Sequence, residues 1–187
     1  YGEPRYVPLD EKHPHQPLNA YGASKSMVET ILKDYDRAYD LKYIALRYFN
    51  VIGADSDGLT GEWHEPETHL VPNILKSVVD DSKTFKIFGT DYDTYDGTCV
   101  RDYVDVRDLA EAHRLAWEYM QRKNQSDVFT LGTEKGNSVK AIFDICEKIL
   151  EVKIPVATAP RRPGDAAALY ADSSRSKALL GWQPRYS

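Results

Sequence analysis

The chain has 187 residues, of which 42% are hydrophobic, and its 24 basic and 29 acidic side chains give a formal net charge of −5. This composition is typical of a globular protein with a sizeable core, and an acidic chain without a basic stripe argues against a nucleic-acid binder. Apolar runs such as Tyr43-Ile44-Ala45-Leu46 are far shorter than the roughly 20 residues that cross a bilayer, which excludes a membrane span.

The first half of the chain predicts a loop, a helix and a strand, followed by a second such set. Four prolines make residues 1–18 an extended loop. Residues 19–39 repeat apolar side chains at helical spacing, which predicts a helix with one buried stripe made of Met27, Val28, Ile31, Leu32, Tyr35, Ala38 and Tyr39. We expect a strand at 43–48, a loop at 53–61, a helix at 70–80, a strand at 84–88 and a polar loop at 89–98.

The second half continues the alternation. We expect a helix at 107–122, a strand at 127–131, a helix at 138–150 capped by Ser138, a strand at 154–158, a loop at 159–168 and a helix at 173–181. Alternating strands and helices predict an α/β fold with mainly parallel strands. The two cysteines, Cys99 and Cys146, are too few for a disulfide framework, so we expect a reducing, cytoplasmic location.

Tyr21 and Lys25 are the first candidates for chemistry, because residues four apart are neighbours on one face of a helix. An ammonium group beside a phenol favours the phenolate, which can take up a proton. The spacing alone is also satisfied by a lysine whose stem lies over the core, as the second pair, Tyr119 and Lys123, shows. Both interpretations stay open at this stage.

Two arginine-bearing segments could bind phosphate. Arg101-Asp102 and Arg161-Arg162-Pro163-Gly164-Asp165 place forked donors in separate loops, where they could hold a pyrophosphate or form ordinary surface ion pairs. Asp165 and Asp172 could accept hydrogen bonds from a sugar. The segment 62–69 is rich in His and Glu, but Pro66 interrupts any helix that would align His64 with His69, so we expect no metal site.

Seven segments together resemble the UDP-glucose 4-epimerases (UDP-galactose 4-epimerases) of the extended short-chain dehydrogenase/reductase superfamily. They follow the family's order along nearly the whole chain: Tyr1-Gly2-Glu3-Pro4, Asn19-Ala20-Tyr21-Gly22-Ala23-Ser24-Lys25, Leu46-Arg47-Tyr48-Phe49-Asn50 with Gly53-Ala54, Glu67-Thr68-His69-Leu70-Val71-Pro72, Ile87-Phe88-Gly89-Thr90-Asp91-Tyr92, Asp96-Gly97-Thr98 through Arg101-Asp102-Tyr103, and Arg161-Arg162-Pro163-Gly164-Asp165. The Tyr-x-x-x-Lys pattern marks only the superfamily, whereas the other segments are more specific to the 4-epimerases.

The resemblance implies a reversible, NAD-dependent inversion at C4 of UDP-glucose and UDP-galactose through a 4-keto intermediate. It implies Tyr21 and Lys25 as the catalytic pair, which also contacts the cofactor NAD together with Phe49. It implies contacts to the UDP-hexose from Asn50, His69, Leu70, Lys86, Ile87, Phe88, Arg101, Arg162, Asp165 and Leu169. Leu169 matches a position that sets the width of the sugar pocket in this family. A homodimer is the expected assembly of the full-length protein.

The resemblance also implies what the chain lacks. The family's glycine-rich dinucleotide turn and a Ser or Thr that assists catalysis have no counterpart here, and the first Met is Met27. We therefore expect a fragment that is inactive and binds no NAD alone: the C-terminal portion of the family's fold. Residues 1–52 would be the late part of a Rossmann domain and 53–187 mostly a UDP-sugar-binding domain, with about 106–133 returning to the Rossmann domain.

Two competing interpretations remain at this stage. One is another nucleotide-sugar enzyme of the same superfamily, namely an epimerase, dehydratase or decarboxylase. The other is a non-catalytic nucleotide-sugar-binding protein that uses Arg101 and Arg162 for binding alone. Retention of Tyr21 with Lys25 weighs against the second interpretation, because binding a nucleotide requires neither residue.

Overall fold

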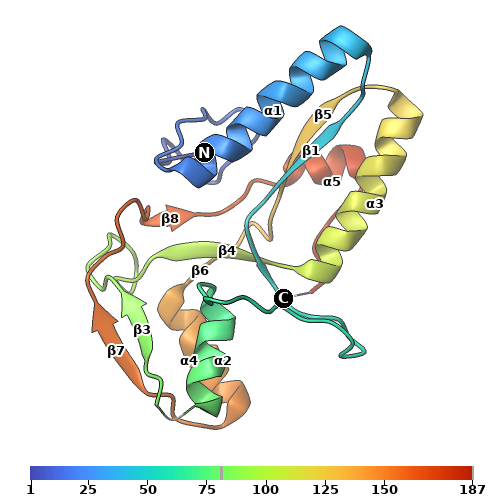
Figure 1. Cartoon of the computed structure of the whole chain (residues 1–187). Coiled ribbons are helices and arrows are strands. Elements are labelled where there is room, and N and C mark those ends of the chain that lie inside the picture. Colours follow the sequence, from blue (N-terminus) through green and yellow to red (C-terminus); the bar gives the residue numbers. More distant parts are fainter. Residues whose placement is uncertain (81, 187) are drawn as a thin grey trace.

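A computed structural model describes residues 1–80 and 82–186 of the chain. Its helices are α1 (Ala20–Tyr39), α2 (Leu70–Val79), α3 (Val106–Lys123), α4 (Val139–Leu150) and α5 (Ser174–Leu180). Its strands are β1 (Ile44–Tyr48), β2 (Asn50–Ile52), β3 (Phe85–Phe88), β4 (Val100–Asp105), β5 (Asp127–Leu131), β6 (Gly136–Ser138), β7 (Val156–Ala159) and β8 (Ala168–Leu169). The helices and strands alternate, which confirms the predicted α/β class (Figure 1).

Polar side chains cap the N-termini of helices α1, α3 and α4. Asn19 Oδ1 accepts from the Gly22 amide at 2.8 Å, and Asp105 Oδ1 accepts from the Arg107 amide at 2.8 Å. Ser138 Oγ accepts from the Ala141 amide at 3.0 Å, which confirms the predicted cap. Each contact satisfies an amide that has no partner inside the helix, and so fixes where the helix starts.

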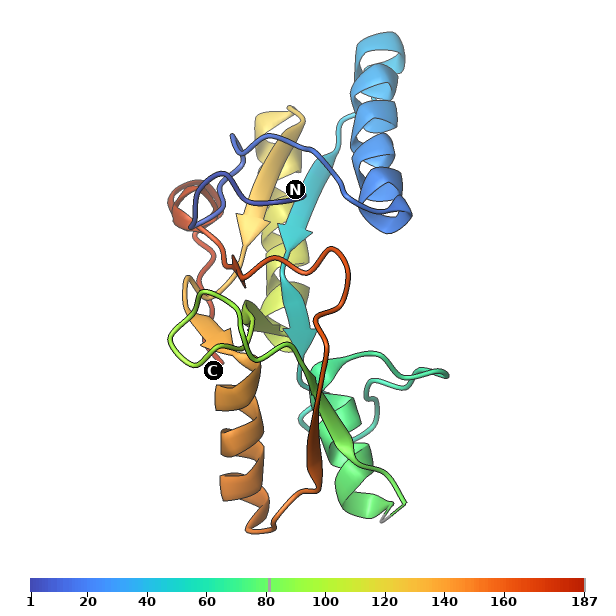
Figure 2. The ribbon, with the colours of Figure 1, turned by 90° about the vertical axis from the view of Figure 1, so that its left-hand side faces the viewer.

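The first structural unit is built around β1 and β5, which pair in parallel with Leu46 opposite Phe129. Both views place α1 on one side of this pair and α3 on the other (Figures 1 and 2). The core between the strands, α3 and α5 contains fully buried Phe129, Leu131 and Trp182. The indole Nε1 of Trp182 donates to the Asp108 carbonyl at 2.8 Å, so its polar atom is satisfied within the core.

The second structural unit has its own core. Strands β3 and β7 pair in parallel, and helices α2 and α4 cover them. Ile74, Phe85, Ile87, Phe143 and Ile154 are buried there, and the rings of Phe85 and Phe143 stack with centroids 5.5 Å apart. Each unit therefore buries its own apolar cluster. The predicted division after residue 52, with residues 106–133 returning, stays a prediction.

Strand β4 lies between the two units. It pairs in parallel with β2 and β8 and antiparallel with β6. These four strands are absent from the sequence-based prediction, which was therefore wrong for residues 50–52, 100–105, 136–138 and 168–169. Three of them have only two or three residues, too few to display a period, and the buried Asp102 and Asp105 hide the apolar pattern of β4.

The expectation of a buried stripe on α1 was wrong. The helix has the predicted length, but none of its residues is buried, and Met27, Ile31 and Tyr39 are 62%, 53% and 73% exposed. Periodicity shows that a helix has an apolar face, but it does not show which element covers that face. Among the described residues, no helix combines the length and the apolar character needed to cross a membrane.

Candidate active site

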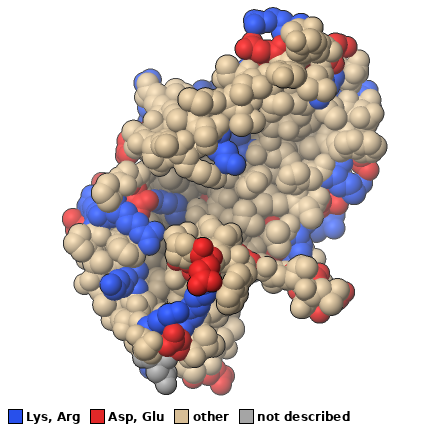
Figure 3. Space-filling model, viewed as in Figure 1, with Lys and Arg blue, Asp and Glu red and all other residues tan. Residues whose placement is uncertain are grey.

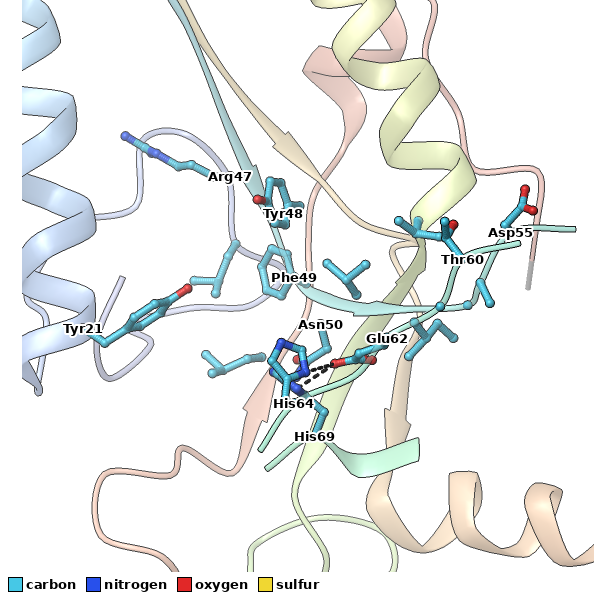
Figure 4. Close-up of a pocket in the computed structure, with 18 of the residues that line it drawn as sticks. Tyr21, Arg47, Tyr48, Phe49, Asn50, Asp55, Thr60, Glu62, His64 and His69 are labelled. Carbon is cyan, nitrogen blue, oxygen red and sulfur yellow. Dashed lines mark ion pairs between the residues drawn. The ribbon is translucent and has the colours of Figure 1, made fainter. Parts of the chain in front are cut away.

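A cavity of about 860 Å³ opens where α1, the end of β1, β2 and the loop before α2 meet. Tyr21, Phe49, Asn50, His69 and Leu169 line it, and all five were singled out from the sequence. Figure 4 shows the Tyr21 ring reaching from α1 toward Phe49 and Asn50 across this cavity. Residues from four separate segments of the sequence thus meet at one place.

Tyr21 and Lys25 lie together on the first turns of α1. The Lys25 Nζ lies 5.3 Å from the centroid of the Tyr21 ring, and Tyr21 itself is 72% exposed. Both residues line a second cavity of about 410 Å³ between α1 and β1, and Tyr21 borders both cavities. The helix cap at Asn19 fixes the backbone two residues before the phenol. The pair is accessible to a ligand, unlike a lysine stem laid over a core.

A partly buried ion pair attaches α1 to β1. Arg47 donates to Glu29 through Nε at 2.7 Å and through Nη2 at 2.6 Å, and the two side chains are only 14% and 15% exposed. Burial alone would raise the pKa of the Glu29 carboxyl, but the Arg47 guanidinium lowers it overall. The sequence analysis did not predict that Arg47 and Glu29 form an ion pair. The resemblance drew attention to the segment that contains Arg47, but nothing pointed to Glu29.

A smaller cavity of about 170 Å³ adjoins the first and shares Asn50 and His69 with it. Its wall includes the predicted residues Leu70, Lys86, Phe88, Arg101, Arg162 and Asp165. Figure 3 shows basic side chains gathered over the lobe that carries β3 and β7, beside the hollow that separates this lobe from α1. The smaller cavity therefore has the charge that suits an anion, in a chain whose overall charge is negative.

The two arginines of the smaller cavity are held differently. Arg101 is 11% exposed, and its Nη1 donates to the carbonyls of Val100 and Ala166 at 2.8 Å each. Arg162 lies over the Phe88 ring, with its Cζ 4.0 Å from the centroid. The adjacent Arg161 is not part of this cavity wall and instead pairs with Asp91 at 2.7 Å. Of the two neighbouring arginines, Arg161 and Arg162, Arg162 is therefore the one that borders the smaller cavity.

Asp102, next to Arg101 on β4, is completely buried and accepts four hydrogen bonds. Its Oδ1 accepts from the amide and hydroxyl of Thr133 at 2.8 and 2.6 Å, and its Oδ2 accepts from the amides of Glu134 and Ala171 at 3.2 and 3.1 Å. Gly132 lies so close that a Cβ there would be 2.4 Å from Asp102 Oδ2. Asp102 thus joins β4 to two other segments and fixes the strand that carries Arg101.

Two residues that the sequence analysis named as candidate ligand contacts, Ile87 and Asp172, do not line either of these two cavities. Ile87 is 8% exposed and belongs to the core of the second unit, so its side chain lines neither cavity. The Asp172 carboxylate accepts from the Ser174 amide at 2.9 Å at the start of α5.

Cys99 is buried, and burial raises the pKa of its thiol, which disfavours the reactive thiolate.

The segment before α2 differs from its prediction in one respect. We expected Pro66 to keep His64 and His69 apart by breaking a helix, but the loop itself folds so that their ring centroids lie 4.8 Å apart. Glu62 and Glu67 lie beside them. The sequence analysis considered this segment and set it aside on helical spacing alone, but a loop can also bring such side chains together.

Comparisons with known proteins agree on one group of relatives. A family model described as GDP-mannose 4,6 dehydratase matches residues 1–187. The UDP-glucose 4-epimerase of Lactobacillus helveticus is 51% identical over 186 residues, covering 100% of this chain and 56% of that protein. The UDP-glucose 4-epimerase of Rhizobium meliloti is 46% identical, and the chain covers 57% of its length. The chain thus spans little more than half the length of the curated relatives that it matches.

Solved structures show the same likeness. The UDP-glucose 4-epimerase from Brucella ovis, in complex with NAD, matches all of this chain and 57% of its own at a TM-score of 0.95 and 43% identity. The enzyme from Bifidobacterium longum, in complex with NAD+ and UDP, matches all of this chain and 56% of its own at a TM-score of 0.93 and 40% identity. The fold therefore corresponds to about half of these enzymes.

Proposed function

Because this chain belongs to the GDP-mannose 4,6 dehydratase family, and its relatives at 42–51% identity are UDP-glucose 4-epimerases, we propose that the whole protein interconverts UDP-glucose and UDP-galactose with NAD. The observation that carries this proposal is the pair of adjoining cavities. One is small and bordered by arginines, the other is wide and bordered by Tyr21, and both share Asn50 and His69. A nucleotide sugar is divided in the same way: its anionic pyrophosphate suits the cavity bordered by arginines, and its neutral sugar suits the wide cavity.

The smaller cavity holds the UDP part in this proposal. Arg101 and Arg162 offer forked N–H donors to the pyrophosphate, and the first turn of α2, including Leu70, contributes the amide end of a helix. Lys86 and Phe88 border the same cavity from β3. Because Arg101 is already held by two carbonyls, little side-chain entropy is lost when it binds the phosphate.

Tyr21 is the acid/base residue in this proposal. Its phenol faces the wide cavity, where it can take the proton of the C4 hydroxyl and later return it to the inverted alcohol. The Lys25 ammonium lies over the same ring, with its Nζ 5.3 Å from the ring centroid. The cavity volume of about 860 Å³ leaves room for the sugar to turn while the nucleotide stays bound.

The residues present also suit the part of NAD that would contact them. Tyr21 and Lys25 border the cavity of about 410 Å³ between α1 and β1, and hydroxyl and ammonium groups suit the hydroxyls of a ribose. When bound, NAD supplies a reversible acceptor for the hydride of C4. The resemblance adds Phe49 to this set, as a residue beside the cofactor.

Two experiments test the proposal. In the whole protein, Tyr21→Phe should reduce conversion of UDP-galactose to UDP-glucose by about 10²–10⁴-fold, the typical contribution of general acid–base catalysis. UDP affinity, measured by calorimetry, should stay within about twofold. Conversion at the normal rate by Tyr21→Phe would contradict the assignment.

The second experiment addresses the nucleotide. Arg162→Gln should weaken UDP binding by roughly 10-fold or more, the loss of one charged hydrogen-bonding group. Arg161→Gln is a matched control on the same loop, because Arg161 pairs with Asp91 and does not border the cavity. Equal losses in both variants would show that the smaller cavity is not the nucleotide site.

We also propose that the whole protein forms a homodimer. The exposed apolar stripe of α1, with Met27, Val28, Ile31 and Tyr35 each at least 50% exposed, supports self-association, because large exposed apolar patches mark interfaces. Ile31→Lys should shift sedimentation of the whole protein toward a monomer, whereas Lys148→Glu on α4 should not. An unchanged sedimentation coefficient in Ile31→Lys would contradict the use of this face.

A further inference from the structure

Four side chains of the loop before α2 converge at the rim of the wide cavity. Glu62, His64, Glu67 and His69 place one ligand atom each within 4.8 Å of one another. Figure 4 shows the two imidazole rings next to each other, with a dashed line from each to the Glu62 carboxylate. His69 Nδ1 lies 2.7 Å from Glu62 Oε1 and 3.2 Å from Glu67 Oε1, and His64 Nδ1 lies 3.4 Å from Glu62 Oε1.

Glu67 provides a second, independent observation. Its side chain is only 3% exposed, and its Oε2 is buried with no hydrogen-bond partner among residues 1–80 and 82–186. The other oxygen, Oε1, accepts from the amides of Thr68 and His69 at 2.8 and 2.9 Å, which holds the carboxylate in place. Lys76 Nζ and His64 Nδ1 are both 3.9 Å from Oε2, beyond hydrogen-bond distance. A buried carboxylate oxygen without a partner is costly, so it calls for a ligand.

The spacing of these atoms suits a small metal ion. Ligand atoms about 2.0–2.1 Å from a tetrahedral zinc ion are about 3.3–3.4 Å from one another. The separations of the closer pairs, 2.7 to 3.9 Å, lie around that value, and all four ligand atoms lie within 4.8 Å of one another. We propose that Glu62, His64, Glu67 and His69 bind one divalent transition-metal ion of the zinc class.

The ligand chemistry selects this class of ion. Two imidazole nitrogens with two carboxylates favour zinc and similar ions over Mg²⁺ and Ca²⁺, which take oxygen ligands. Protonated histidines could also pair with Glu62, but that arrangement leaves Glu67 Oε2 3.9 Å from the ammonium and imidazole nitrogens described above. A metal ion instead uses this oxygen as a ligand.

The site would connect the loop to the cavity. It joins residues 62–64 to the N-terminus of α2, and Glu62, His64 and His69 all border the wide cavity. The His64 and His69 side chains are 51% and 49% exposed, so the ion has one side open to solvent and to a bound sugar. The ion would therefore fix the wall of the cavity opposite Tyr21. This inference does not depend on the proposed epimerase activity.

The test is a titration of the 187-residue chain with Zn²⁺ against a chromophoric chelator, without substrate or NAD. We expect one equivalent to bind with micromolar or tighter affinity, and His64→Ala to weaken binding by at least about 10-fold. His113→Ala is the matched control, because the Nδ1 of His113 lies 2.7 Å from the Leu109 carbonyl within α3. Glu67→Gln keeps the shape of a buried side chain and should also weaken binding at least about 10-fold.

Two further readouts separate this site from others. Binding should weaken as the pH is lowered, because protons compete with the metal ion for its ligands. X-ray absorption of the Zn²⁺-loaded chain should show only nitrogen and oxygen ligands near about 2.0–2.1 Å, whereas Cys99 or Cys146 would add sulfur at about 2.3 Å. Absence of micromolar binding, equal affinity in wild type and both variants, or a sulfur shell would each overturn the proposal.

Discussion

Asp102→Asn tests whether the buried carboxylate holds the strand that carries Arg101. The two oxygens of Asp102 accept four hydrogen bonds, two on each side, and the side chain is fully buried. An asparagine has the same shape but accepts on one side only. Its less costly orientation places the amide nitrogen beside Thr133, whose hydroxyl can turn to accept from it, while the Thr133 amide loses its acceptor.

The magnitude follows from that count. A hydrogen bond to a charged group contributes roughly 1.5–3 kcal/mol, and a buried donor facing another donor adds to its loss. We therefore expect Asp102→Asn to lower the free energy of unfolding by about 2–4 kcal/mol. This is a large part of the roughly 5–15 kcal/mol that stabilises a typical domain.

Urea unfolding of the 187-residue chain, followed by far-ultraviolet circular dichroism, measures the effect. With a slope of about 2 kcal/mol per molar urea, the midpoint should fall by about 1–2 M. Asp144→Asn is the control, because Asp144 pairs with Lys140 on the surface with both side chains about half exposed, and should change stability by less than about 0.5 kcal/mol. A loss below about 1 kcal/mol in Asp102→Asn would refute the argument that this carboxylate organises the strand.

Three further predictions concern stability and pH. The pKa of Glu29 lies below its ordinary value of 4.5, since Arg47 outweighs the opposing effect of burial, so the pair stabilises the fold above about pH 4.5 and less as the pH falls further. The stability difference between wild type and Glu29→Gln should accordingly shrink between pH 6 and pH 3.5 in urea titrations. Ser138→Ala should lower the free energy of unfolding by about 1–2 kcal/mol through loss of the helix cap, measured by thermal unfolding against Ser82→Ala. Gly53→Ala should cost about 1–3 kcal/mol, because φ is +93° and the new Cβ would lie 2.7 Å from an Asp105 oxygen.

The sequence predicts the long elements well, because their signal is local. The helices that became α1, α2, α3 and α4 were expected within two residues of their observed ends, and strand β5 at its observed residues. Strand β4 was missed because Asp102 and Asp105 interrupt its apolar pattern, and the burial of Asp102 depends on donors from residues 133, 134 and 171. Such donors become visible only when distant segments are brought together.

The candidate site also divides into features with a local sequence signal and features that depend on contacts between distant segments. Spacing alone placed Tyr21 and Lys25 on one helix turn, and the resemblance added the residues of the two cavities, of which the Ile87 side chain lines neither. The partly buried pair of Arg47 and Glu29 has no local signal, because its members are 18 residues apart on different elements. The loop that joins His64 to His69 likewise follows no periodic rule.

The two halves of the proposed site are attached to the protein in different ways. Arg101 lies on a strand inside the sheet and is fixed by two carbonyls, whereas Tyr21 lies on a helix whose apolar stripe is exposed and which is joined to β1 by the Arg47–Glu29 ion pair. In the proposed function, rigid anchoring of the nucleotide would retain the substrate, while the wide cavity beside Tyr21 would allow the sugar to turn. Loss of a nucleotide contact should therefore weaken binding, and loss of the phenol should slow the reaction.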